Sequence, residues 1–143
     1  MTSIVIDSSV SLKWVLDDEI DSDKALELQK HHLAGKINLI APSLWYYEVV
    51  NGLKNASLTK PDLKISLLEA KLNQLLKSSP ALQDIYDLSP LVFKNSYRYQ
   101  ISAYDSAYIT LAHSHKIKLV TADSKLVTKI ANPRLVMGLI NYH

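Results

Sequence analysis

The segment from Ser102 to Asp123, SAYDSAYITLAHSHKIKLVTAD, limits the possible folds most strongly, because its periodicity changes partway along. Its first part has apolar residues at i, i+3 and i+4, which predicts a helix with one buried face over 101–112. Residues 116–121 then form a short run rich in β-branched side chains, which predicts a buried strand. A helix leading directly into a strand is typical of a parallel α/β sheet.

The rest of the chain repeats this alternation. We expect strands at 3–6, 37–41 and 135–140, with 84–88 a short strand or a turn, and the first strand at the centre of the sheet. We expect helices at 8–16, 22–33, 44–55, 59–76, 89–99 and 124–131. At 143 residues the chain is expected to form one domain, 1–143, with a mostly parallel sheet between helices.

Composition excludes several classes of protein. The chain has no cysteine, which rules out a disulfide framework, a thiolate metal site and a cysteine nucleophile, and fits a reducing cytoplasm. The start, MTSIVIDSSV, lacks a basic region, and no apolar run approaches a membrane span, so we expect a cytoplasmic protein with no membrane segment. The net charge of +2 permits a polyanionic partner without indicating one.

An acidic cluster separates the first two predicted helices. We interpret it as a solvated linker that also caps the second helix, and a cation site there is the weaker alternative. Its members are Asp17, Asp18, Glu19, Asp21 and Asp23.

Four other carboxylates have more informative positions. Asp7 ends the first predicted strand, and Asp123 follows the strand at 116–121. Asp105 interrupts an apolar helical stripe, and Glu48 shares its helix face with mainly apolar or small residues. Sites in open α/β sheets form at the carboxyl ends of the strands, so we expect these acids to converge there.

Converging carboxylates repel one another unless a cation lies among them. An all-oxygen set, with no cysteine and no histidine at ligand spacing, suits Mg²⁺ or Mn²⁺. Such ions activate water and stabilise charge on phosphates. The residues therefore predict metal-dependent chemistry on a phosphodiester.

Each acid also has a purely structural explanation. Asp7 and Asp123 are suited to cap the helices that follow them. Glu48 fits an exposed position within a helix, and Asp105 fits a pair with a buried Lys or Arg. One by one these explanations compete well, but four placements toward one edge favour a site.

Other reaction classes lack their motifs. The chain has no GxGxxG and no GxxxxGK[ST], so a glycine-rich nucleotide loop is not expected. Ser8 and Ser9 do not lie in GxSxG, the serine-hydrolase motif. A receiver domain needs an acidic pair after the first strand and a haloacid-dehalogenase-type phosphatase needs DxD, whereas this chain has Asp7 followed by two serines.

At this point the motifs resemble a known family. The chain resembles PIN-domain proteins and is most similar to the VapC-type toxin ribonucleases of VapBC toxin–antitoxin systems. The matching motifs, in the order of the family, are IVIDSSV with Asp7 and Ser9, PSLWYYEVVNGL with Glu48 and Asn51, YDSAYITLA with Asp105, and LVTAD with Thr121 and Asp123.

The resemblance implies a three-layer α/β/α sandwich with a sheet of about five strands, and an endonuclease that cuts RNA to leave a 5′-phosphate and a 3′-hydroxyl. It implies a homodimer that is inhibited by a VapB-type antitoxin, whose C-terminal segment lies across the active groove. The implied catalytic residues and ligands of Mg²⁺ or Mn²⁺ are Asp7, Glu48, Asp105 and Asp123. The implied residues that support them are Ser9, Asn51 and Thr121.

Two points stay open at this stage. Lys13, Lys54 and Lys125 lie near the acidic motifs in sequence and are candidates to contact the RNA backbone. The alternative function is a catalytically inactive PIN-fold module that binds RNA or acts as a scaffold.

Overall fold

The computed structural model describes residues 1–16 and 20–143 of the chain, and its centre is one parallel sheet. The strand order is β3-β2-β1-β4-β5, and all four neighbouring pairs are parallel. The strands are β1 (Thr2–Ile6), β2 (Ile37–Pro42), β3 (Ala81–Gln83), β4 (Leu119–Thr121) and β5 (Val136–Gly138). The predicted α/β fold, with a mostly parallel sheet of about five strands, is confirmed.

The first strand is central because it is apolar on both faces. Ile4, Val5 and Ile6 are all buried, as expected for a strand covered by helices on both sides. Val5 pairs with Ile40 of β2 on one side and with Leu119 of β4 on the other.

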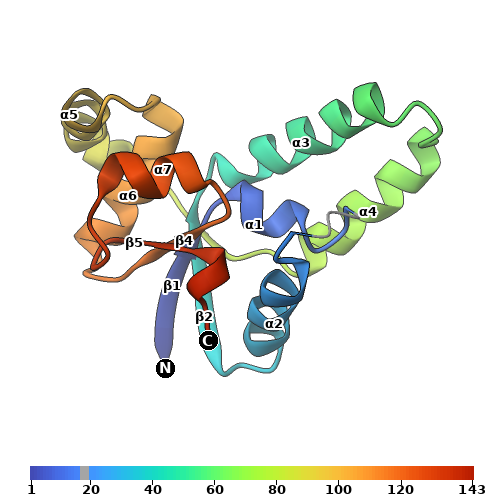
Figure 1. Cartoon of the computed structure of the whole chain (residues 1–143), viewed down its shortest axis with the longest axis horizontal. Coiled ribbons are helices and arrows are strands. Elements are labelled where there is room, and N and C mark those ends of the chain that lie inside the picture. Colours follow the sequence, from blue (N-terminus) through green and yellow to red (C-terminus); the bar gives the residue numbers. More distant parts are fainter. Residues whose placement is uncertain (17–19) are drawn as a thin grey trace.

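The helices form two layers around the sheet (Figure 1). They are α1 (Ser8–Leu12), α2 (Ser22–Leu33), α3 (Trp45–Thr59), α4 (Ile65–Lys77), α5 (Ser89–Tyr99), α6 (Ala103–Ser114) and α7 (Ser124–Ile130). Right-handed crossovers place α1 to α4 on one face and α5 to α7 on the other. Figure 1 shows α3 and α4 extending beyond the sheet as a helical arm.

The strand order creates a switch point between β1 and β4. From β1 the chain moves outward to β2 and β3, then crosses the opposite face and returns beside β1 as β4. The loops after these two central strands therefore leave in opposite directions, which opens a crevice at their carboxyl ends. Asp7 directly follows β1, and Asp123 lies two residues after the end of β4.

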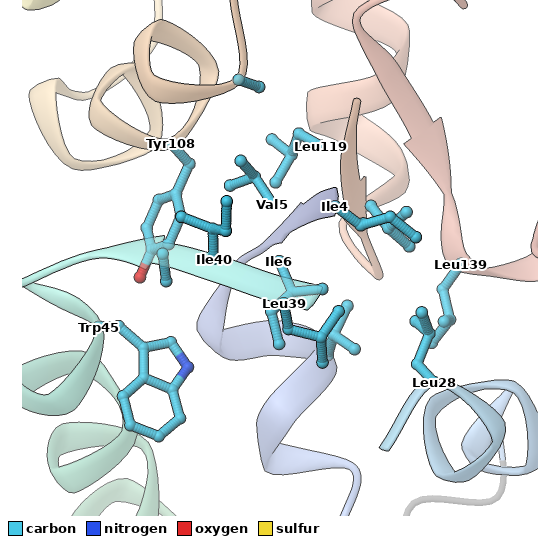
Figure 2. Packing of buried hydrophobic residues seen from close by; sticks show 14 of the residues in the cluster. Ile4, Val5, Ile6, Leu28, Leu39, Ile40, Trp45, Tyr108, Leu119 and Leu139 are labelled. Carbon is cyan, nitrogen blue, oxygen red and sulfur yellow. The ribbon is translucent and has the colours of Figure 1, made fainter. Parts of the chain in front are cut away.

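A continuous hydrophobic core fixes the helix layers on the sheet. Its largest fully buried side chains are Trp45 and Tyr108, one from each helix layer. Figure 2 shows Tyr108 beside Ile40, with its hydroxyl pointing away from Val5 and Leu119. The ring of Tyr108 therefore belongs to the core, although its polar end does not.

The connection between α3 and α4 differs from the sequence prediction. The third helix continues to Thr59, beyond the expected end at 55, and the fourth begins at Ile65 instead of 59–62. Pro61 explains the break, because the residue before a proline is disfavoured in helical conformation, and Lys60 has φ −127° and ψ 80°.

The third strand lies just before the segment for which a short strand or a turn was expected. It spans Ala81–Gln83, directly after Pro80, whereas the expected strand or turn at 84–88 is a 3-10 helix, η1 (Tyr86–Leu88). Strands β4 and β5 are shorter than expected, and the chain after β5 becomes a second 3-10 helix, η2 (Leu139–Asn141). The first helix is also shorter than the predicted 8–16.

The acidic cluster is only partly described. Asp17, Asp18 and Glu19 lie outside the described residues. Asp21 occupies the position before α2 with φ 58°, and its side chain makes no capping hydrogen bond to the described helix, so it does not provide the expected cap. Within the described ranges, no helix is long and apolar enough to cross a bilayer.

Candidate active site

Asp7 lies at the carboxyl end of β1, where the sheet passes into α1. Its carboxylate is buried, with 7% of the residue exposed, and accepts a hydrogen bond from the backbone N–H of Val10 at 3.4 Å. Asp7 therefore caps α1, as its structural explanation predicted. This single bond uses only part of the hydrogen-bonding capacity of the carboxylate.

Two hydroxyl groups hold the oxygens of Asp7. Ser9 Oγ donates to Oδ1, and Thr121 Oγ1 donates to Oδ2 at 2.5 Å. Each hydroxyl oxygen also accepts a backbone N–H, from Ala122 at 3.0 Å for Ser9 and from Asp123 at 3.1 Å for Thr121. Because each hydroxyl oxygen accepts from a backbone N–H, the proton of that hydroxyl points at Asp7. The residues at the end of β4 and just after it therefore orient the Asp7 carboxylate.

Glu48 reaches the site because α3 packs closely on α1. Trp45, fully buried in the first turn of α3, donates from Nε1 to the Oγ of Ser11 at 3.0 Å. One turn beyond Glu48, a Cβ at Gly52 would overlap the side chain of Leu12, so only glycine lets the two helices approach this closely without adjustment.

A tyrosine from the opposite helix layer holds the Glu48 carboxylate. Tyr108 in α6 donates its hydroxyl proton to Oε1 at 2.5 Å. Glu48 is half-buried and therefore does not occupy the exposed position that its structural explanation required. Sequence analysis missed this contact, because helical spacing identified the buried ring and gave no information about what its hydroxyl reaches.

Asp105 and Asp123 lie at the starts of two helices. Asp105 is half-buried in the first turn of α6, where its backbone N–H bonds to Oγ of the capping Ser102 at 3.1 Å. Asp123 is exposed and caps α7, accepting from the N–H of Lys125 at 3.0 Å and of Leu126 at 3.2 Å. Both acids therefore have a local structural role besides any chemical one.

Asp105 is the electrostatic centre of the four acids. Burial raises the pKa of Asp7 to about 6, against its bonds to Ser9 and Thr121, and the charge of Asp105 adds to the rise. Burial also raises the pKa of Glu48, with a further contribution from Asp105. The pKa of Asp105 itself is raised by burial and then by the charge of Asp123.

Burial and neighbouring carboxylates cause these upward shifts. Lys129 lowers the pKa of Asp105, but by less than burial and the charge of Asp123 raise it. A divalent cation among these carboxylates would relieve both the burial cost and their mutual repulsion. The electrostatics therefore fit a metal ion.

The donor atoms, all carboxylate oxygens, suit Mg²⁺ or Mn²⁺ better than a metal that prefers nitrogen or sulfur ligands. In the described part of the chain, no three Asp, Glu, His or Cys side chains are close enough to form a metal-binding group as they stand. Mg²⁺ usually keeps several waters and takes only one or two carboxylates, with substrate phosphates completing its shell. The oxygen-only donor set agrees with this coordination preference of Mg²⁺.

Two grooves flank these acids and meet at α1, since Leu12 lies in the wall of both. The first encloses about 630 Å³ and is lined by Ser8, Tyr47, Glu48, Asn51 and Tyr104. The second encloses about 830 Å³ and is lined by Ser9, Lys13, Thr59, Lys60 and Asp123. Lys54 instead lines a third groove between α3 and α4.

Asn51, which the resemblance implied as a support for Glu48, shares a groove with it. It is exposed and lines the first groove beside Glu48. The groove also contains Tyr47 and Tyr104, and both side chains are exposed. Helical spacing did not indicate that these two side chains are exposed.

Solved structures of other proteins share this fold. PAE2754 from Pyrobaculum aerophilum has a TM-score of 0.67 at 20% identity, covering 97% of this chain and 92% of that one. FitAcB from Neisseria gonorrhoeae has a TM-score of 0.61 at 11% identity, covering 96% and 99%. FitAB bound to an IR36 DNA fragment has a TM-score of 0.59 at 13% identity, covering 98% and 96%.

At these identities the solved structures show a shared fold. No match was found among curated proteins. A family model for the PIN domain, in contrast, matches residues 4–131. Because that match spans most of the sequence, the chain belongs to the PIN-domain family.

Proposed function

We propose that this protein is a divalent-metal-dependent endoribonuclease, the VapC-type toxin of a type II toxin–antitoxin pair. The observation that carries the proposal is the electrostatic coupling of Asp105 to Asp7, Glu48 and Asp123 at the switch point of the sheet. Coupled, partly buried acids at such a crevice are typical of functional sites. Membership of a family whose proteins are generally nucleases supports the reaction class.

In this proposal the four acids hold Mg²⁺ or Mn²⁺. The bound ion would supply an activated water and stabilise charge on the phosphate oxygens. Ser9 and Thr121 keep both oxygens of Asp7 in a fixed orientation, and Tyr108 does the same for Oε1 of Glu48. Fixed carboxylates lose little freedom when they bind an ion, which favours affinity.

Positive charge beside the acids supports a nucleic-acid substrate. Lys13 and Lys60 line the second groove together with Asp123. Ammonium groups in a groove that ends at the site would attract the phosphate backbone and make RNA binding weaken with salt. Lys54 and Lys125 are less well placed, since Lys54 lines another groove and Lys125 lines neither groove beside the acids.

A cleavage assay tests the nuclease proposal. Purified protein with Mn²⁺ should cut RNA, and cleavage should be lost with Asp105→Asn or in excess EDTA. Asp62→Asn is the matched control, because Asp62 is exposed in the connection between α3 and α4 and lines neither groove beside the acids. Equal cutting by Asp105→Asn, or in EDTA, would overturn the proposal.

The second candidate is a PIN-fold module that binds RNA or acts as a scaffold without cutting. It is favoured by the finding that no three acids among the described residues lie close enough to form a metal-binding group. Calorimetry separates the two functions: heat from Mn²⁺ binding that disappears in Asp7→Ala supports the nuclease. RNA affinity with no detectable Mn²⁺ binding supports the inactive module.

The toxin, its VapB-type antitoxin, its homodimer and its place in the cytoplasm belong to the same proposal and rest on the sequence resemblance. Expression in a bacterial host should arrest growth, and Asp7→Ala should remove the arrest. A neighbouring reading frame for a small DNA-binding protein should restore growth when it is co-expressed. Growth that is unaffected by the wild-type protein would count against the toxin.

A further inference from the structure

Two exposed tyrosines stand beside the candidate site. Tyr47 directly precedes Glu48 and Tyr104 directly precedes Asp105, and each tyrosine is 66% exposed. Both line the first groove, which also contains Glu48. Large aromatic side chains that converge in one groove from α3 and α6 mark a binding surface more often than chance exposure.

A neighbouring ring supports the first tyrosine. Tyr46 and Tyr47 have ring centroids 4.1 Å apart with planes tilted by 34°, so Tyr46 covers one face of the Tyr47 ring. Tyr47 nevertheless stays largely exposed, so its remaining surface is available in the groove. A ring that is already stacked on one side is partly immobilised, which lowers the entropy lost when another ring stacks on it.

The charge of the groove selects which part of a nucleotide enters it. Its charged lining residue is Glu48, which repels a phosphate when no metal is bound, whereas a nucleobase is neutral and has two π-faces. The amide of Asn51, exposed in the same lining, carries both donors and an acceptor that suit a base edge. The lysines lie instead in the second groove, on the other side of α1.

We propose that Tyr47 and Tyr104 form a base-stacking subsite beside the acids, which takes one unpaired base of the RNA. This inference rests on the proposed ribonuclease function. A base inside a duplex already stacks on its neighbours and is not available to these rings, whereas an unpaired base is. The strand lies with a base in the first groove and its backbone toward the second.

Binding measured without cleavage tests the subsite. Fluorescence anisotropy in EDTA compares a labelled oligouridine of about 12 nucleotides with a duplex of equal length and with an abasic ribose-phosphate oligomer. The wild-type protein should prefer the oligouridine to both. Tyr47→Ala and Tyr104→Ala should each weaken oligouridine binding on the order of tenfold and leave binding of the abasic oligomer unchanged.

Control variants separate stacking from general damage to the surface. Tyr47→Trp and Tyr104→Trp should retain oligouridine binding, because tryptophan also stacks. Tyr86→Ala should bind like the wild type, since Tyr86 is 79% exposed but does not line the groove. Size-exclusion chromatography of each variant reports whether its assembly state changes.

The failure of this inference can be told apart from failure of the ribonuclease proposal. Alanine variants that bind oligouridine as tightly as the wild type, or that change assembly without changing base preference, overturn the stacking subsite even if metal-dependent cleavage stands. Equal affinity of the wild type for duplex and oligouridine also overturns it. Binding that depends on the tyrosines, in a protein that cuts no RNA, supports the stacking subsite and overturns the nuclease proposal.

Discussion

Thr121 donates a hydrogen bond to Asp7 across 114 positions of sequence, with 2.5 Å between Oγ1 and Oδ2. The bond joins the ends of the two central strands, β4 and β1, at the switch point where the strand order reverses. Because the same hydroxyl accepts the backbone N–H of Asp123, one buried side chain positions parts of two candidate metal ligands.

Replacing Thr121 by valine removes this link without changing the volume of the side chain. Asp7 loses a bond that stabilises its charged form, and the N–H of Asp123 loses its acceptor. We expect metal-dependent cleavage to fall about tenfold to a hundredfold and the free energy of unfolding to fall by about 1–3 kcal/mol. Cleavage rates at saturating RNA and urea unfolding measure the two effects.

Thr121→Ser is the matched control, since it keeps the hydroxyl and removes only a methyl group. It should cleave RNA at close to the wild-type rate. Wild-type activity in Thr121→Val would show that the hydrogen bond to Asp7 does not serve the chemistry.

The raised pKa of Asp7 predicts how the stability of the metal-free protein changes with pH. Burial raises the pKa of this side chain from its ordinary value of 3.8 to about 6, so the folded state holds the proton more tightly than the unfolded state. The free energy of unfolding in EDTA should therefore fall as pH rises from about 4 to about 6, by about 3 kcal/mol. Glu48 and Asp105 shift in the same direction.

The variant Asp7→Asn isolates this contribution. Its difference in stability from the wild type should change with pH over the same window, and saturating Mn²⁺ should reduce the loss seen in the wild type. A difference that stays constant between pH 4 and 7 would contradict the raised pKa of Asp7.

Removing the hydroxyl of Tyr108 tests whether Glu48 contributes to metal binding. Tyr108→Phe keeps the buried ring and removes the hydrogen bond to Oε1 of Glu48. In the wild type this bond favours the charged form of the Glu48 carboxylate. We expect the Mn²⁺ concentration for half-maximal cleavage to rise on the order of tenfold, with most of the maximal rate recovered at high Mn²⁺. An unchanged Mn²⁺ requirement would mean that Glu48 does not contribute to metal binding.

Sequence alone predicted the sheet and the edge at which the acids lie. Asp7 and Asp123 each follow an apolar run rich in β-branched residues, and the carboxyl ends of parallel strands share one edge, so their neighbourhood follows from the pattern. Strand β3 escaped prediction because three residues after a proline carry no measurable period.

The contacts that hold the site could not be read from sequence. Ser9 and Thr121 lie 112 positions apart, and their shared acceptor depends on the register of β1 against β4. Tyr108 lies on the buried face of the helix predicted at 101–112 and is 1% exposed, but helical spacing does not reveal that α3 presents Glu48 to its hydroxyl. Periodicity indicates which face of a helix or strand a residue occupies, whereas its hydrogen-bond partner depends on tertiary packing.

The buried bond between Trp45 and Ser11 predicts how firmly α3 is held against α1. Trp45→Phe leaves the Ser11 hydroxyl, which is 0% exposed, without its donor and creates a small cavity. We expect the free energy of unfolding to fall by about 2–4 kcal/mol, more than for Ser11→Ala alone. Because Glu48 lies one turn from Trp45, cleavage should also fall at temperatures where the variant remains folded.

A double-mutant cycle with Trp45→Phe and Ser11→Ala isolates the bond from the cavity. A coupling of about 1 kcal/mol in urea unfolding is expected if the 3.0 Å contact contributes in solution. Zero coupling would mean that the indole stabilises the interface by packing alone. In that case Ser11→Ala should leave cleavage unchanged, whereas a bond that positions α3 requires both single variants to lower it.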